Sequence, residues 1–165
     1  MTLRNFGLHL AATVVAALIA VTPVRAANIV DTAAKAGQFK TLLAAATAAG
    51  LAGDLATGLS LTVFAPTDAA FRRLPKGTVE NLLKPENRDQ LRSILTYHVL
   101  PVRVAASDVP RQPTRVATLN GTSQLLVVRN GHGVRVDNAR VVKADIVADN
   151  GIIHVIDRVL IPKQH

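Results

Sequence analysis

The chain has 165 residues, of which 49% are hydrophobic and 18% charged, and its formal net charge is +8. This balance is too apolar for a disordered chain, and the length favours one domain with a core of its own. There is no cysteine, which excludes disulfides, thiolate metal sites, cysteine nucleophiles and a lipid-modified N-terminal cysteine. The surplus of positive charge favours an anionic partner without identifying it.

Residues 1–26 have the pattern of a secretory signal peptide. Arg4 precedes an apolar run over residues 8–21, and the small residue Ala26 precedes the expected cleavage site. The run is shorter than the roughly 20 residues that a membrane-spanning helix needs. We therefore predict a domain over residues 27–165 with no transmembrane segment, exported to the periplasm or the extracellular space. Cleavage removes two arginines and no acid, so the net charge falls from +8 to +6.

In the first half of this domain, apolar residues recur at spacings of three and four, which indicates helices. A β-branched and aromatic run that ends at Pro66 indicates one short strand, and either Thr67 or Asp68 can cap the helix after it. We expect helices over residues 28–36, 38–49, 69–74, 78–83 and 87–98, and the strand over residues 60–65.

The second half changes to β-branched and apolar runs that are typical of strands. Turn signals at residues 130–133 and at Asn150-Gly151 separate these runs, and the proline-rich stretch over residues 109–114 is interpreted as a loop. The expected strands cover residues 123–129, 134–137, 139–148 (one bent strand or a pair) and 152–161. Helices followed by antiparallel strands predict an α+β domain, with N-terminal helices packed on a small antiparallel sandwich or wedge.

Three segments resemble, in order and spacing, the signature motifs of the fasciclin domain. The first covers residues 62–71 (TVFAPTDAAF), the second is Tyr97-His98 at the end of a helix, and the third covers residues 150–160 (NGIIHVIDRVL). The resemblance extends over nearly all of the expected domain and implies a single-domain, secreted, bacterial-type member. It implies a fasciclin-like fold and a non-enzymatic binding module that acts in cell-surface or matrix adhesion, an inference by analogy.

The resemblance also implies that the adhesive surface lies around Tyr97-His98 and the helix before it. Two interpretations of this motif are compatible: a recognition site, or a core contact in which the tyrosine ring packs under the sheet and His98 binds a carboxylate. For the second we predict a hydrogen bond or ion pair between His98 and Asp68, which would raise the pKa of His98. The candidate binding residues are Tyr97, His98, Arg88, Arg92 and Arg103.

His154 lies between Ile152 and Ile156 on one face of its expected strand, which favours a hydrogen-bonded structural residue. The predicted structural residues are thus Asp68, His98 and His154. The sequence contains no nucleophile elbow, phosphate-binding loop or zinc-protease motif, and no two histidines have ligand spacing on one element. We therefore predict no enzyme activity, no metal and no cofactor.

The positive charge lies mostly in the second half, as arginines scattered among acids. Arginine binds carboxylates and phosphates bidentately. The expected domain has only three phenylalanines and one tyrosine, so a base-stacking surface is missing and nucleic acid is not the expected partner. We expect a protein or an anionic polymer of the envelope or matrix. The alternative is a small-ligand or ion-binding envelope protein, which requires a cavity of roughly a few hundred Å³.

Overall fold

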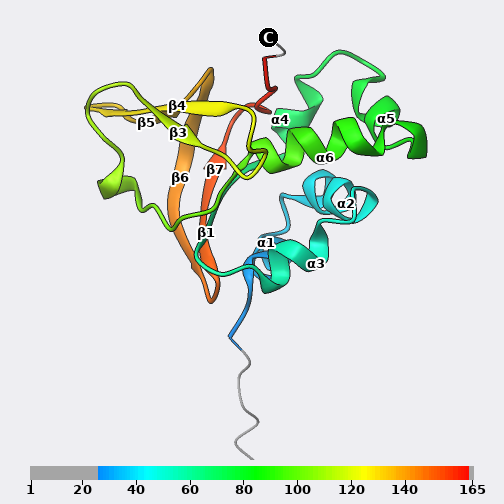
Figure 1. Ribbon diagram of the computed structural model, residues 1–165, viewed down its shortest axis with the longest axis horizontal. Helices are drawn as coiled ribbons and strands as arrows, with labels where there is room; N and C mark the ends of the chain where they lie inside the picture. Colours follow the sequence, from blue (N-terminus) through cyan, green and yellow to red (C-terminus); the bar gives the residue numbers. More distant parts are fainter. Residues whose placement is uncertain (1–25, 164–165) are drawn as a thin grey trace, which may run out of the picture.

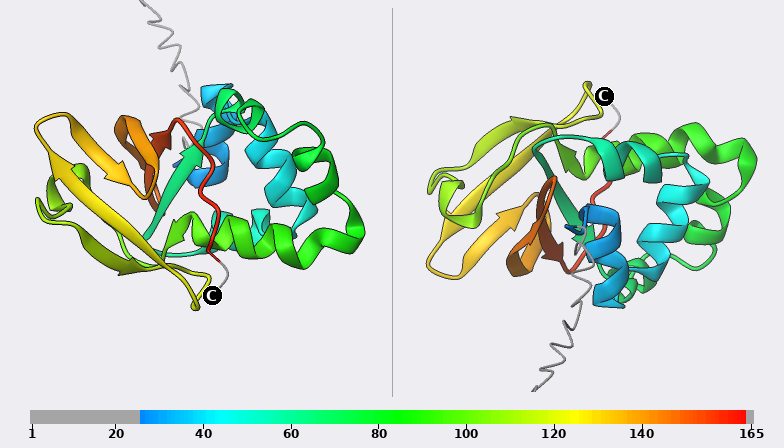
Figure 2. Two further views of the ribbon diagram at one scale, coloured as in Figure 1. Left: turned by 90° about the horizontal axis from the view of Figure 1, so that it is seen from above. Right: turned by 90° about the horizontal axis from the view of Figure 1, so that it is seen from below.

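The computed structural model describes residues 26–163, so the predicted signal peptide lies outside the described residues apart from Ala26. Helices pack against one side of a sheet whose outer strands extend away from them (Figures 1 and 2). The helices are α1 (Ile29–Ala36), α2 (Lys40–Ala48), α3 (Ala52–Thr57), α4 (Asp68–Arg72), α5 (Thr78–Leu82) and α6 (Arg88–Tyr97), with 3-10 turns at Pro85–Asn87 and Ala106–Asp108. The strands are β1 (Leu61–Pro66), β2 (Val99–Leu100), β3 (Thr114–Ala117), β4 (Gln124–Asn130), β5 (Gly133–Val136), β6 (Ala139–Ala148) and β7 (Gly151–Ile156).

The seven strands form one sheet in the order β2-β1-β7-β6-β5-β4-β3. The predicted α+β fasciclin-like fold is confirmed, but the sheet is mixed, because β1 and β7 run parallel while the other neighbours are antiparallel. Every residue of β1 and β7 is buried, as expected of parallel strands that are covered on both faces. Their register places Phe64 opposite His154 and Leu61 opposite Gly151.

Two apolar cores lie on the two faces of β1 and β7. The helix-side core contains Val63 and Ile153 together with α1, α2 and α6. The opposite core contains Phe64, Ile156 and Tyr97 together with the inward residues of β4 and β5. The β1–β7 strand pair therefore lies between the two cores and packs into both. Helix α6 also contributes to both, because Tyr97 at its end lies in the opposite core while its other buried residues lie in the helix-side core.

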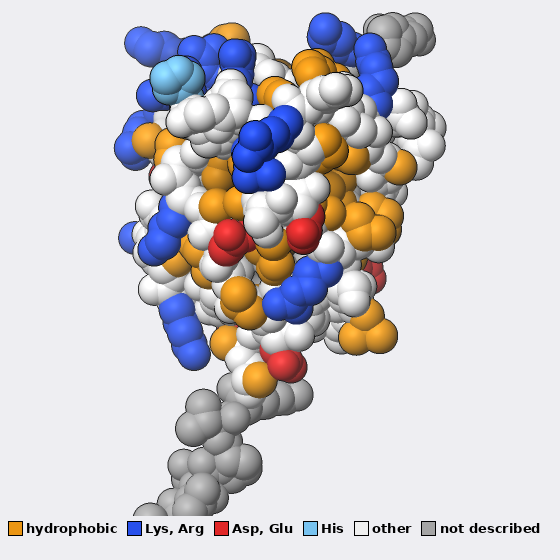
Figure 3. Space-filling model, turned by 90° about the vertical axis from the view of Figure 1, so that its left-hand side faces the viewer, with side chains coloured by type: hydrophobic (Ala, Val, Ile, Leu, Met, Phe, Trp, Pro, Cys, Tyr) orange, Lys and Arg blue, Asp and Glu red, His pale blue; other side chains and the backbone are white. Residues whose placement is uncertain are grey.

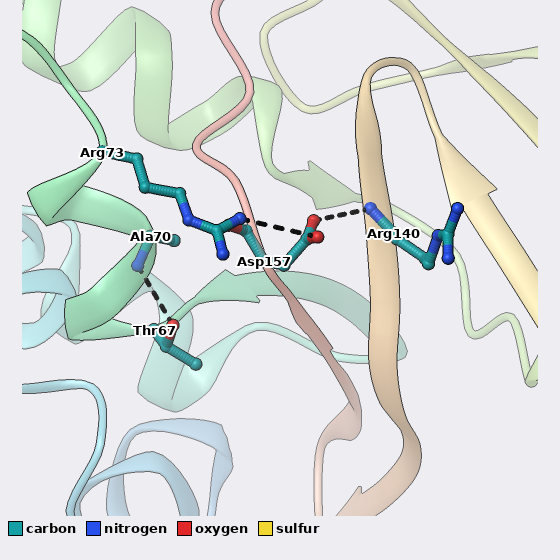
Figure 4. A network of polar contacts seen from close by, with 5 residues as sticks. All are labelled: Thr67, Ala70, Arg73, Arg140 and Asp157. Carbon is teal, nitrogen blue, oxygen red and sulfur yellow. Dashed lines mark hydrogen bonds and ion pairs between the residues drawn. The ribbon is translucent and has the colours of Figure 1, made fainter.

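Two helix ends explain how the first signature segment folds. Thr67 Oγ1 accepts the Ala70 amide at 3.2 Å and so caps α4 (Figure 4). Asp68 does not cap its own helix; its carboxylate accepts the amides of Thr41 at 2.8 Å and Lys40 at 3.4 Å. It thereby caps α2, whose own N-cap residue, Phe39, has no polar side chain to do so.

The structure also differs from the expected elements at four places. Helix α3 and the short strands β2 and β3 were not predicted, and β3 begins at the end of the expected proline-rich loop. The last strand ends at Ile156 instead of residue 161. There the Asp157 carboxylate accepts the Arg140 amide at 2.8 Å and lies 3.7 Å from the Arg73 guanidinium, so the chain turns away from the sheet (Figure 4).

Candidate functional site

Tyr97 is the last residue of α6, and its ring is buried in the core under the outer strands. Its hydroxyl donates a hydrogen bond to Asp137 Oδ2 at 2.7 Å. Asp137 is held in turn by Leu126, whose amide donates to Asp137 Oδ1 at 2.9 Å and whose carbonyl accepts the Asp137 amide at 2.8 Å. Burial, followed by the hydrogen bond to Asp137, raises the pKa of Tyr97, so the hydroxyl stays protonated and donates.

This tyrosine–aspartate pair borders a hollow of about 380 Å³, here called the Tyr97 hollow. Its other walls come from the β3–β4 hairpin and from the chain after β7. Arg115 and Lys163 line it and supply positive charge beside the Asp137 carboxylate. Leu126, an exposed leucine, also lines it. The hollow therefore combines two cations and an apolar side chain with a carboxylate that already accepts the Tyr97 hydroxyl, and the two cations are suited to a carboxylate-bearing partner.

His98, directly after Tyr97, is buried and does not reach the surface. Its Nδ1 lies 2.8 Å from the Ile94 carbonyl, and its Nε2 accepts the Leu160 amide at 2.9 Å. Burial lowers the pKa of His98 to about 4, although the bond to Ile94 opposes this shift. Because Nε2 must be unprotonated to accept an amide, the ring is neutral and Nδ1 is the donor.

The predicted contact between His98 and Asp68 is wrong, and so is the predicted rise in the pKa of His98. Both ring nitrogens of His98 are satisfied by backbone groups, and Asp68 is committed to the α2 amides. For Asp68, burial acts to raise the pKa, but the hydrogen bonds from Thr41 and Lys40 and the nearby Arg72 lower it overall. Among the described residues, the His98 ring bonds only to backbone groups, and no carboxylate contacts it to raise its pKa.

His154 lies in the middle of β7 and is 2% exposed. Its Nδ1 accepts the Asp145 amide at 3.2 Å, and its Nε2 lies 2.7 Å from the Val104 carbonyl, to which it donates. The ring also stacks on Phe64 of β1, with centroids 5.6 Å apart. His154 thus links β6, β7 and the segment after β2, and both of its nitrogens are used.

The three candidate arginines do not converge on Tyr97. Arg92 lies on the side of α6 that faces α3, where its guanidinium is 3.5 Å from Asp54. Arg88 packs over Gly50 at the end of α2, and Arg103 is exposed in the loop after β2. None of the three lines the Tyr97 hollow. Sequence patterns do not identify the residues that surround it, among them Arg115, Asp137 and Lys163, because these residues come from separate segments and carry no local motif.

A second space, on the helix side of the sheet, is apolar and partly open to solvent. It is lined by α1, α2, α6 and the central strands, and it measures about 30 Å³. This is far below the roughly 300–1,000 Å³ of ordinary ligand pockets. Within residues 26–163, no cluster of three or more histidine and carboxylate side chains is arranged to hold a metal ion. Over the same residues, no helix has the length and apolar character needed to cross a bilayer.

A helical layer on a mixed sheet, with a tyrosine–histidine pair at the junction, defines an α+β domain of the fasciclin type. The chain belongs to the fasciclin domain family, whose model matches residues 37–162. It is 49% identical over 137 residues to Protein sll1483 of Synechocystis, covering 83% of this chain and 74% of that protein. It is 41% identical over 103 residues to the immunogenic protein MPT70 of Mycobacterium tuberculosis, covering 61% and 49% respectively.

The fold is also similar to a solved structure of a FAS1 domain pair from the insect cell adhesion molecule Fasciclin I. The TM-score is 0.60 at 26% sequence identity, and the match covers 73% of this chain and 44% of that one. The match thus extends over less than half of the solved pair.

Proposed function

We propose that this protein is an exported, non-enzymatic binding module that acts in adhesion at the cell surface or in the matrix. Membership of the fasciclin family supports the class of function, and the insect relative of known structure is itself a cell adhesion molecule. The proposal includes export through a signal peptide over residues 1–26, as the sequence pattern predicts.

The observation that carries the proposal is the Tyr97 hollow. Its two cations, Arg115 and Lys163, are placed to bind a carboxylate of a partner protein, while the Tyr97 hydroxyl, which donates to Asp137, helps to shape the hollow. Leu126 and Leu119, on the same hairpin, are 38% and 42% exposed and add apolar contact area beside the charges. Protein interfaces commonly combine such a partly apolar centre with a polar rim.

Two features support a role other than catalysis. His98 and His154 are the buried histidines of the described chain, and each uses both ring nitrogens in bonds to backbone groups. Neither has a free nitrogen for general acid or base chemistry. The tyrosine hydroxyl, with its raised pKa, is held as a hydrogen-bond donor and not as a base.

A second candidate function is the binding of a small anionic ligand by an envelope protein. The volume of the Tyr97 hollow, about 380 Å³, favours it, since ordinary ligand pockets begin near roughly 300 Å³. Two observations favour the adhesion module instead. The lining of the Tyr97 hollow is largely polar, and the apolar space on the helix side of the sheet is small.

The test is an adhesion assay on surfaces coated with the full-length protein, with envelope and matrix proteins as the opposing layer. We expect Arg115→Gln/Lys163→Gln to reduce adhesion strongly, and Arg88→Gln/Arg92→Gln, which removes the same charge elsewhere, to leave it nearly unchanged. Adhesion that resists the first change and is lost with the second would move the site to α6. Competition by small carboxylates alone, with no protein partner bound, would favour the second candidate.

A further inference from the structure

The far end of the β4–β5 hairpin carries a concentration of arginine outside the Tyr97 hollow. Residues 103–145 contain seven lysines and arginines and three acids. Figure 3 shows Lys and Arg side chains gathered around an exposed histidine at the upper left of this side of the molecule. Four arginines of this region, here called the hairpin arginines, come from the hairpin and its neighbours: Arg111, Arg129, Arg135 and Arg140.

The three acids of this region are already committed to backbone amides. Asp108 accepts the Ala105 amide at 3.0 Å, and Asp145 accepts the Ala106 amide at 2.9 Å. Asp137 accepts hydrogen bonds from the Leu126 amide in β4 and from the Tyr97 hydroxyl. None forms an ion pair with a hairpin arginine, so the positive charge of the region is not balanced within the described chain.

Arg135 and Arg140 lie directly opposite each other on β5 and β6, and both are exposed. Like charges in such a cross-strand pair are destabilising. The backbone amide of Arg140 binds Asp157, but Figure 4 shows its side chain directed away from that carboxylate. This pair therefore places two exposed arginines opposite each other on neighbouring strands, and within the described residues neither forms an ion pair with a carboxylate.

A second pair lies where the hairpin meets the loop before β3. Arg111 and Arg129 line a hollow of about 230 Å³ together with Asn130 and Gly131 at the turn. Arg129 Nε donates to the Val109 carbonyl at 3.2 Å, which fixes the guanidinium at the edge of this hollow. A fixed planar guanidinium beside a second one is suited to a sulfate or carboxylate group.

We propose that the hairpin arginines bind an acidic polysaccharide. Arg129 pairs with buried Val134 while Arg135 pairs with Val128, so the two arginine pairs lie on different faces of the hairpin. A chain with repeated carboxylate or sulfate groups can reach both faces, whereas a single small ion cannot. The site is separate from the Tyr97 hollow and does not depend on the proposed adhesion function.

The surroundings favour a polysaccharide over the other polyanions. The exposed large hydrophobic side chains of the described residues include none between residues 127 and 141, and those nearest the hairpin arginines, Leu126 and Val142, lie at the two edges of this stretch, so the hairpin end has no apolar centre of its own. The phenylalanine and tyrosine side chains of the described residues, Phe39, Phe64, Phe71 and Tyr97, are all buried, so these residues provide no exposed phenylalanine or tyrosine surface for stacking nucleic-acid bases.

The experiment is a titration of the full-length protein with heparin and with alginate, with neutral dextran and duplex DNA as comparisons. We expect both acidic polysaccharides to bind, with affinity that falls as salt rises, and dextran not to bind. Arg135→Gln/Arg140→Gln should weaken binding about tenfold or more. Arg111→Gln alone should weaken it by a smaller factor. The matched control, Lys76→Gln/Lys84→Gln, removes the same charge from the helical side and should change affinity less than about twofold.

Three results would overturn this proposal. One is the absence of binding to both acidic polysaccharides at low salt. Another is an equal loss of polysaccharide affinity in Arg135→Gln/Arg140→Gln and in the lysine control, because net charge alone would then explain the effect. The third is binding of duplex DNA as tight as that of the polysaccharides. Unchanged thermal unfolding of each variant shows that the exposed substitutions leave the fold intact, and Arg115→Gln/Lys163→Gln should bind heparin nearly as well as the parent.

Discussion

His98 Nε2 accepts a hydrogen bond from the backbone amide of Leu160, 62 positions later in the chain, at 2.9 Å. The other ring nitrogen donates to Ile94, so one neutral imidazole joins the last turn of α6 to the segment that follows β7. This link fixes the end of α6 and with it Tyr97, the next residue back, whose hydroxyl borders the Tyr97 hollow.

The first prediction concerns the stability that this link supplies. His98→Ala leaves the Ile94 carbonyl and the Leu160 amide buried without partners, at about 1–3 kcal/mol each, and adds a cavity. We expect the free energy of unfolding to fall by about 3 kcal/mol or more in urea denaturation. His132→Ala, at an exposed turn, is the control and should stay within about 0.5 kcal/mol of the parent. Equal effects of the two changes would contradict the role of His98.

The second prediction concerns pH. The pKa of His98 is about 4 in the folded protein and 6.5 ordinarily, so between these values the unfolded chain binds a proton that the folded protein does not. The contribution of His98 to the free energy of unfolding is fully present above pH 6.5. It is lost as the pH falls toward 4, and the total loss is about 3 kcal/mol.

Urea midpoints of the parent and of His98→Ala across this range provide the measurement. The difference between the two should shrink as the solution becomes acidic. A difference that instead grows toward low pH would indicate a charged His98 with a raised pKa, as the sequence had suggested.

The third prediction concerns the cap that Asp68 provides for α2. Asp68→Ala removes the acceptor of the Thr41 and Lys40 amides and should destabilise the protein by about 1–2 kcal/mol. Asp68→Asn keeps an acceptor oxygen in the same place, so it should cost less. Chemical denaturation at neutral pH compares them, and an asparagine variant as unstable as the alanine variant would argue against capping.

The fourth prediction concerns the parallel pairing of β1 and β7. A Cβ atom on Gly151 would lie 2.1 Å from the Leu61 carbonyl oxygen, so Gly151→Ala must push the two strands apart. We expect a loss of about 3 kcal/mol or more in thermal or urea unfolding. Gly53→Ala, in α3 with no atom within 4 Å of the added carbon, should be neutral or slightly stabilising. Comparable losses in both variants would refute the close approach at Gly151.

Elements with local signals could be predicted from the sequence. The helix expected over residues 28–36 is α1, which begins one residue later with Asn28 as its N-cap, and the expected turn at Asn150-Gly151 leads directly into β7. The parallel pairing of β1 with β7 could not be predicted, because both strands are buried on both faces and an apolar run does not identify its neighbour. Strand β3 was missed because its four residues follow a proline-rich stretch and pair on only one side, with β4.

The site could be predicted only in outline. The tyrosine–histidine motif gave the position of Tyr97, but its partner Asp137 is 40 positions away with nothing in the sequence to connect them. The expected partner of His98, Asp68, was wrong because a long-range cap competes for that carboxylate. One signal in the sequence points to this long-range cap. Helix α2 begins after Phe39, whose side chain cannot cap a helix, so a side chain from elsewhere must cap it.

The central claim, recognition through the Tyr97 hollow, is tested most directly by the dissociation constant for an adhesion partner measured with Arg115→Gln/Lys163→Gln. We predict binding weakened about tenfold or more, with the unfolding transition unchanged, because the two cations that face the partner's carboxylate are gone. An unchanged dissociation constant in this variant, together with lost binding in Arg88→Gln/Arg92→Gln, would contradict the account and assign recognition to the outer face of α6.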